Sequence, residues 1–133
     1  MDQEELLFFS GRPGALALYV RVRELLLARW PESIVNVRKT QIGFSLPVLY
    51  AIVWLPRRKA DRDCLMLSLC LPRRLEEARV EQAVETNPGR WTNHLLLRDV
   101  SQLDDELLTW LAEAACFAGR RTARRKHNMP RAK

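Results

Sequence analysis

The segment CLMLSLCL at residues 64–71 alternates between two kinds of side chain, and this alternation indicates how the chain folds. Successive side chains of a β-strand point to opposite faces, so these residues separate into two unlike sets. One set holds only leucines and the other mixes sulfur and hydroxyl groups: Leu65, Leu67, Leu69 and Leu71 against Cys64, Met66, Ser68 and Cys70. The alternation predicts a strand whose leucine face covers a hydrophobic core and whose second face belongs to a different surface.

Other segments predict the strands that accompany it. They are IVNVRK at 34–39, TQIGFSL at 40–46, LYAIVWL at 49–55 and WTNHLLLR at 91–98. Short polar connections between consecutive strands favour antiparallel pairing, so we expect an antiparallel sheet of about five strands. Residues 72–90 fit no strand pattern, and a short helix or a loop is expected there before a turn at TNPG.

Helices are predicted on both sides of the strands. PGALALYVRVRELLLARW at 13–30 places its apolar residues on one stripe and starts with Pro13. A last helix is expected after Ser101, which forms a capping box with Asp104, and it should end at Gly119. The order α-β-β-β-β-(short helix or loop)-β-α predicts one α+β domain over residues 1–119, with the N- and C-terminal helices packed on one face of the sheet.

The net charge of +6 is concentrated at the C-terminal end. No acidic residue follows Glu113, and the basic residues beyond Gly119 account for the whole excess. We therefore expect residues 120–133 to form a disordered basic tail. Such a tail makes contacts to nucleic-acid phosphates one hypothesis, with these candidate residues: Arg120, Arg121, Arg124, Arg125 and Lys126.

Several classes of function find no support in the motifs. The two histidines are far apart and no C-x-x-C pair exists, so no metal site is predicted. Glycine-rich phosphate loops and nucleophile elbows are absent, so no cofactor and no catalytic residue are predicted. The acidic start and the short apolar run at 46–56 favour a cytoplasmic protein without membrane contact.

The sheet face opposite the leucines is the expected functional surface. It should carry a mixed set of side chains: Gln41, Ser45, Met66, Ser68, Thr92 and His94. Such a face suits a ligand groove, and it equally suits one half of a homodimer interface.

A candidate anion site lies within this region. Lys39 and Thr40 occupy the tight connection between the first two strands, and Arg90 precedes the strand that carries His94. If the two strand ends meet, two cations beside an imidazole would bind a small anion. The alternative is that Lys39 and Arg90 are solvated turn residues and His94 is a half-buried structural residue. The repeated LPRR at 55–58 and 71–74 is interpreted as two separate strand ends rather than one basic patch.

Five segments together resemble a known family: VRKTQIGFS, YAIVWLPRR, LPRRLEEAR, GRWTNHLLLR and LDDELLTWLAEA. The chain is similar, from about Phe8 to Gly119, to small bacterial proteins of domain-of-unknown-function family 5655, which share K-T-x-I-x-F and R-W-T-x-H segments. The matching residues are Lys39, Thr40, Ile42 and Phe44, then Arg90, Trp91, Thr92 and His94. The resemblance implies no established reaction.

Three functions remain open on this basis. The first is a non-enzymatic module that binds a small anion or a protein partner near Lys39, Arg90 and His94. The second is a nucleic-acid-associated protein that acts through the basic tail. The third is an enzyme in which His94 serves as general acid or base.

Overall fold

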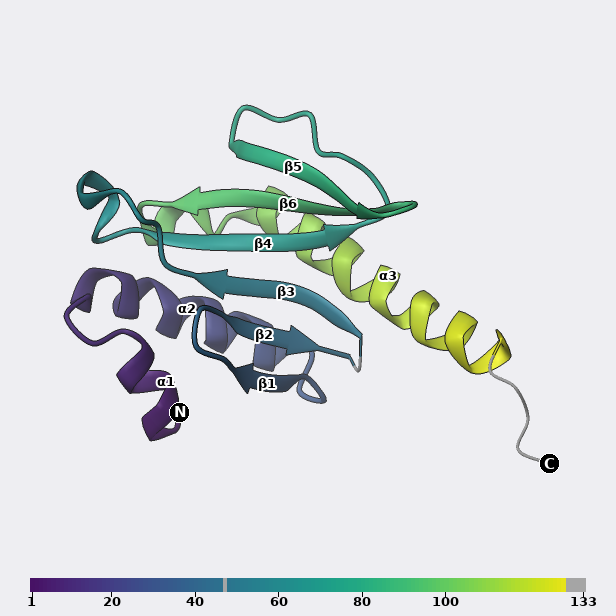
Figure 1. The fold of residues 1–133 in the computed structure, drawn as a ribbon, viewed down its shortest axis with the longest axis horizontal. Helices are drawn as coiled ribbons and strands as arrows, with labels where there is room; N and C mark the ends of the chain where they lie inside the picture. Colours follow the sequence, from purple (N-terminus) through teal and green to yellow (C-terminus); the bar gives the residue numbers. More distant parts are fainter. Residues whose placement is uncertain (47, 129–133) are drawn as a thin grey trace.

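The computed structural model describes residues 1–46 and 48–128 and confirms the α+β class (Figure 1). Its helices are α1 (Gln3–Phe8), α2 (Pro13–Arg29) and α3 (Asp105–Asn128). Its strands are β1 (Ile34–Val37), β2 (Ile42–Ser45), β3 (Leu49–Trp54), β4 (Leu65–Leu71), β5 (Val80–Asn87) and β6 (Arg90–Leu97). They form one antiparallel sheet in the order β1-β2-β3-β4-β6-β5, with α2 and α3 behind it in Figure 1. Two single 3₁₀ turns, η1 (Lys59–Asp61) and η2 (Val100–Gln102), lie in the loops.

The leucine face of β4 forms the centre of the core, as the alternation predicts. Leu65, Leu67, Leu69 and Leu71 have no exposed surface. They belong to one cluster with buried residues of the two long helices, among them Tyr19, Val22, Leu107 and Leu111. Burying four leucine side chains stabilises the fold by roughly 6–12 kcal/mol before conformational entropy is subtracted.

The segment 72–90 differs from the prediction, because it contains the strand β5 instead of a short helix or a bare loop. After β4 the chain forms β5 at the edge of the sheet, one strand position away from β4. It then reverses at Gly89 (φ 75°), where the turn is predicted, and returns as β6 between β4 and β5. As an edge strand, β5 leaves most of its side chains exposed on both faces. Its sequence therefore carries no apolar alternation, and its pairing with β6 holds it in the sheet.

Two side chains attach the β4–β5 connection to the body of the protein. The buried amide of Asn93 accepts a hydrogen bond from the Leu75 N–H (2.8 Å) and donates one to the Arg73 carbonyl (3.2 Å). Arg79 donates to the Asp104 carboxylate (2.9 Å), and its guanidinium lies 5.5 Å from the centre of the Trp110 ring. These contacts fix where β5 begins.

Both predicted ends of the last helix need correction. α3 begins at Asp105, where the Asp104 side chain accepts a hydrogen bond from the Leu107 N–H (3.0 Å), whereas Ser101 lies in η2. Gly119 does not end the helix, because it lacks the positive φ of a helix-terminating glycine and the helix continues to Asn128. The predicted tail therefore has helical backbone as far as Asn128, and residues 129–133 lie outside the described residues. Across residues 1–46 and 48–128, no helix has the length and apolar character needed to cross a membrane.

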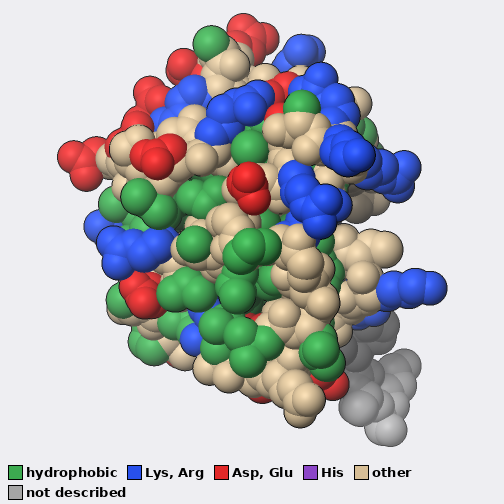
Figure 2. All heavy atoms as spheres, turned by 90° about the vertical axis from the view of Figure 1, so that its left-hand side faces the viewer, with side chains coloured by type: hydrophobic (Ala, Val, Ile, Leu, Met, Phe, Trp, Pro, Cys, Tyr) green, Lys and Arg blue, Asp and Glu red, His purple; other side chains and the backbone are tan. Residues whose placement is uncertain are grey.

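Helix α1 is attached to α2 by a buried carboxylate. Glu5 is 2% exposed, and it accepts hydrogen bonds from the Tyr19 hydroxyl and from Arg23 Nε (2.8 Å). The other side of α1 is apolar and open, since Leu6 and Leu7 are 46% and 63% exposed. Figure 2 shows hydrophobic side chains gathered in the lower half of this end of the molecule, the half in which α1 lies. The attachment brings Phe8, the last residue of α1, to the sheet surface described next.

Candidate functional site

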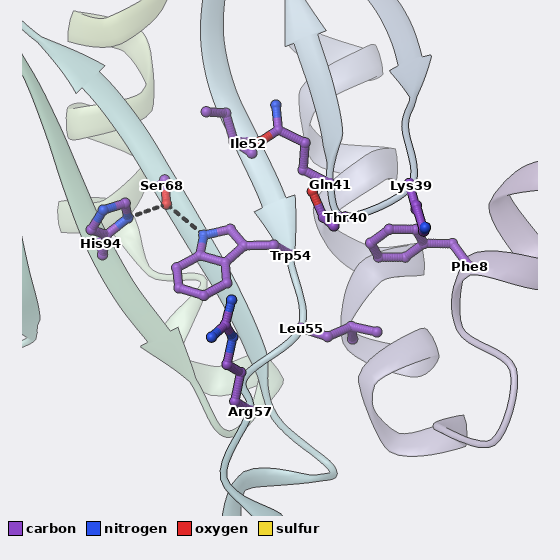
Figure 3. A pocket seen from close by; sticks show the side chains of 10 residues that line it. All are labelled: Phe8, Lys39, Thr40, Gln41, Ile52, Trp54, Leu55, Arg57, Ser68 and His94. Atoms are coloured by element: carbon purple, nitrogen blue, oxygen red, sulfur yellow. Dashed lines mark hydrogen bonds between the residues drawn. The ribbon is translucent and has the colours of Figure 1, made fainter. Parts of the chain in front are cut away.

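A pocket of about 420 Å³ opens on the sheet face opposite α2 and α3 (Figure 3). Its lining comes from segments that are far apart in the chain. The connection β1–β2 contributes Lys39, Thr40 and Gln41, and β3 with the loop after it contributes Ile52, Trp54, Leu55 and Arg57. Single residues of α1, β4 and β6 complete it: Phe8, Ser68 and His94.

The sheet register places the floor of this pocket. Ile52 pairs with Ser68, and Ser68 pairs with His94, so the three residues form one row across β3, β4 and β6. Residues that pair directly share a sheet face, which puts the row on the side away from the leucines. The predicted mixed face is thus confirmed for its β4 and β6 members, although Met66, Ser68 and Thr92 are more buried there than an open surface requires.

A chain of hydrogen bonds orients His94. Trp54 Nε1 donates to Ser68 Oγ (2.8 Å), and Ser68 Oγ lies 2.5 Å from His94 Nδ1. The indole N–H is only a donor, so we assign the Ser68 hydroxyl hydrogen to the bond with Nδ1, which leaves the histidine hydrogen on Nε2. The imidazole also meets the Trp54 ring edge to face, with centres 5.5 Å apart.

Ser68 serves as a support in this arrangement. Its hydroxyl has a partner on each side, and the residue has no exposed surface. A nucleophile must reach a substrate atom, which a fully buried hydroxyl cannot do without movement of Trp54. Through its two hydrogen bonds, Ser68 therefore positions His94 and Trp54 as pocket walls.

The pKa of His94 follows from its position. Burial lowers this pKa below the ordinary value of 6.5, so the imidazole is neutral at about pH 7. We expect His94 to titrate below 6.5 in an NMR titration of the ring nitrogens, with the His94→Gln variant identifying its resonance. The same spectra should show the hydrogen on Nε2. A pKa above 6.5 would contradict the description of a half-buried, uncharged ring.

Two cationic side chains in the pocket lack an acidic partner among the residues that the structure describes. They are Lys39 and Arg57, both exposed and outside every ion pair found there. None of the ten residues in Figure 3 is acidic. Figure 2 looks at the end of the molecule that carries the loop after β3, and its upper half shows Lys and Arg side chains mainly toward the right and Asp and Glu side chains mainly toward the left. The pocket is therefore a positively charged region without an internal counterion.

The structure brings together three of the four predicted anion-site residues. Lys39, Thr40 and His94 line the pocket, whereas Arg90 does not. The Arg90 guanidinium instead approaches the Leu49 carbonyl (3.4 Å) and Cys70 Sγ (3.3 Å), at the other end of β3 and β4. Its predicted place as the second cation is taken by Arg57.

Arg57 belongs to the first LPRR segment and was not among the residues predicted for the anion site. The register of the β2–β3 hairpin would have identified it. Ile42 pairs with Val53 in antiparallel β2 and β3. Extending this register outward by three residues sets Lys39 beside Pro56, next to Arg57 in the chain. The second LPRR lies at the far end of β4, where Arg73 pairs with Glu113 (2.9 Å). The two copies are separate, as predicted.

The nucleic-acid candidates lie away from this pocket, on α3. Arg120 is exposed, with its guanidinium 5.8 Å from the centre of the Phe117 ring. For Arg121, Arg124, Arg125 and Lys126 the helical backbone is described and the side chains are not. In the described part of the chain, no three His, Cys, Asp or Glu side chains gather as metal ligands.

Comparison with known proteins adds the family. No curated protein and no solved structure matches the chain. A family described as a domain of unknown function (DUF5655) matches residues 7–117, a range that contains every residue lining the pocket. On this match, which confirms the resemblance seen in the sequence, the chain belongs to the DUF5655 family.

Proposed function

We propose that this protein is a binding module for a small anion, held in the pocket by Lys39 and Arg57. The observation that carries the proposal is a pocket with two cations and no acidic residue in its lining. Lys39 and Arg57 are exposed, and both side chains border the same hollow, where no acidic side chain offsets their charge. Two that line one hollow without a partner favour a negatively charged ligand.

Neutral groups of the pocket support the same proposal. The Thr40 hydroxyl and the Gln41 amide lie next to Lys39 and offer hydrogen bonds that do not require a charge on the ligand. Trp54 lies in the middle of the view in Figure 3, between these groups and His94, and offers a flat apolar wall. Such a combination of apolar walls and a few polar groups is typical of small-molecule sites.

Charge removal in the pocket tests the proposal, with inorganic phosphate as the probe. We expect Lys39→Gln and Arg57→Gln each to weaken phosphate binding about tenfold, because each removes a charge-assisted hydrogen bond. Binding is measured by the shift of the Trp54 indole N–H signal during an NMR titration at low salt.

Lys59→Gln is the matched control, since Lys59 is exposed in the same loop and does not line the pocket. It removes one positive charge and should leave the phosphate affinity within about twofold. If all three variants weaken binding equally, the effect belongs to net charge and the proposed site is wrong. Absence of any phosphate-dependent shift at Trp54 would also overturn it.

A further inference from the structure

A second hollow adjoins the pocket on the same sheet face. It too measures about 420 Å³, and Trp54 and Arg57 line both. The register explains their contact, because Trp54 pairs with Met66 and Met66 with Leu96. This row is next to the row of Ile52, Ser68 and His94 on the same face, two residues later on β3 and β6 and two residues earlier on antiparallel β4. We call the first space the cationic pocket and the second the apolar hollow.

The walls of the apolar hollow differ from those of the cationic pocket. Met66 and Leu96 form, with Cys64 and Trp54, a small hydrophobic cluster separate from the main core. Pro56 adds another apolar wall. This cluster lies on the face that α2 and α3 do not cover, so the hollow offers apolar surface to a ligand.

Charges at the hollow show which end of a ligand would enter it. Asp61 is buried and already engaged, by Arg58 Nε (3.1 Å) and by Arg98 Nη1 (3.3 Å). Glu81 is exposed and forms no ion pair among residues 1–46 and 48–120, so its negative charge faces any occupant. Arg58 also lines the hollow but pairs with Asp61, and Arg57 is shared with the cationic pocket. Among the lining residues, Glu81 is therefore the unpaired charge that belongs to the hollow alone. An acidic group is held better between Arg57 and Lys39 than beside Glu81. An apolar group pays no such cost.

We propose that the ligand is an organic monoanion with an apolar chain, whose acidic group binds in the cationic pocket and whose chain crosses Trp54 into the apolar hollow. The inference rests on the proposed function and adds the chemical class of the ligand. It follows from two neighbouring spaces that share Trp54 and Arg57, of which one adds Lys39 and the other adds the apolar side chains of Pro56, Met66 and Leu96. Volumes of this size suit small-molecule ligands.

A series of straight-chain monocarboxylates from acetate to decanoate tests the inference on the full chain. Affinity should rise about fourfold for each added methylene until the hollow is filled, because each methylene leaves water for an apolar wall. The dicarboxylate with the length of decanoate should bind at least tenfold more weakly than decanoate, since its second carboxylate would meet Glu81 and the apolar walls. Binding is followed by calorimetry below the concentration at which the acids form micelles.

Two variants separate the two ends of the ligand. Leu96→Ala should flatten the dependence on chain length and leave phosphate binding unchanged. Lys39→Gln should weaken every acid by a similar factor and leave the dependence on chain length intact. Val100→Ala is the control, because Val100 is an exposed aliphatic residue outside both spaces. Melting curves confirm that each variant is folded, and Met66→Ala replaces Leu96→Ala if the latter is not.

The outcomes distinguish this inference from the proposed function. Phosphate and acetate binding without any gain from longer chains would overturn the inference and leave the anion site standing. Decanoate binding that decyl alcohol matches, and that Lys39→Gln does not change, would overturn the inference, and the phosphate titration decides the anion site separately. Binding of neither phosphate nor any acid would overturn both. Rising affinity that disappears in Leu96→Ala supports the amphipathic ligand.

Discussion

Asn93→Asp is expected to lower the free energy of unfolding by about 3–5 kcal/mol near pH 7, the cost of a buried charge without a counterion. Asn93 has no exposed surface, and both ends of its amide are used. Aspartate keeps the oxygen that accepts from the Leu75 N–H. It replaces the donating nitrogen with a second oxygen, which would face the carbonyl oxygen of Arg73 and be repelled by it.

Chemical denaturation measures this loss, and the pH dependence identifies its cause. A carboxyl buried at this position has a raised pKa, so the folded variant binds a proton more readily than the unfolded chain. The deficit relative to wild type should therefore shrink as the pH falls from about 7 to about 4. A deficit that is constant with pH would point to a packing defect instead of a buried charge.

Asn36→Asp provides the matched control, because Asn36 is an exposed residue of the edge strand β1. The same chemical change there should alter the free energy of unfolding by less than about 0.5 kcal/mol. Hydrogen exchange adds a local measurement. Relative to wild type, Asn93→Asp should increase the exchange rates of the β5 amides more than those of the β2 amides. The reason is that the lost contacts attach the connection that leads into β5.

The role of Asn93 shows how far the sequence could be interpreted. Alternation in 91–98 places Leu95 and Leu97 on the core side, and the structure confirms both. The same parity turns Asn93 toward the core beside Leu95, where a polar residue requires buried partners. Those partners, Leu75 N–H and the Arg73 carbonyl, lie in the segment that has no pattern. The need for them was predictable from the sequence, and their identity was not.

The strands that bury a face were predictable, and the strand that buries none was not. β4 has four leucines on one side because α2 and α3 cover it. No helix requires an apolar face on β5, since β5 lies at the sheet edge beyond β6 and most of its side chains are exposed. Its pairing with β6, and not the burial of one whole face, makes it a strand, and that pairing depends on tertiary context.

The candidate site shows the same limit at the level of single residues. Period two assigns His94 to the correct face, and the short connection between β1 and β2 locates Lys39. Which end of the sheet a cation occupies depends on register across several strands. Arg90 and Arg57 both lie at or just beyond the end of a strand. Only Arg57 lies at the same end of the sheet as Lys39.

The second large effect is expected for Glu5→Gln, which should cost about 3 kcal/mol of the free energy of unfolding near pH 7. The Glu5 carboxylate accepts hydrogen bonds from the Tyr19 hydroxyl and from Arg23, and it completes the capping box with the Asp2 N–H (3.2 Å). A neutral amide removes the counterion of Arg23 and brings an N–H₂ group toward donors. Arg23 is about a quarter exposed and can be partly rehydrated, so the lower end of the range for a broken buried pair applies.

The control is Glu24→Gln, which changes the same residue type in an exposed ion pair. Glu24 and Arg21 lie 3.1 Å apart on α2, with more than half of each side chain exposed. Such pairs contribute about 0.5 kcal/mol or less, so the variant should unfold close to wild type. Similar losses in the two variants would mean that burial of Glu5 does not determine its contribution.

The pH dependence of the Glu5 effect has a definite sign. Burial by itself raises the pKa of Glu5, but the hydrogen bonds from Tyr19 and Arg23 outweigh it and hold the pKa below the ordinary 4.5. The unfolded chain therefore takes up the proton first as the pH falls. The stabilisation by the carboxylate is complete above pH 4.5 and is lost as the pH drops toward the lower folded-state pKa. The difference between wild type and Glu5→Gln should accordingly be constant from about pH 7 to about pH 5 and shrink below that.

A binding measurement tests whether the contacts of Glu5 with Tyr19 and Arg23 affect the cationic pocket. Glu5 fixes α1 on α2, and α1 ends in Phe8, which lines the cationic pocket without any charge of its own. Loosening α1 should therefore weaken phosphate binding at Trp54 by about threefold or less, far below the effect of Lys39→Gln. If Glu5→Gln abolished binding while the domain stayed folded, α1 would have to hold the ligand directly, and the roles assigned to Lys39 and Arg57 would be wrong.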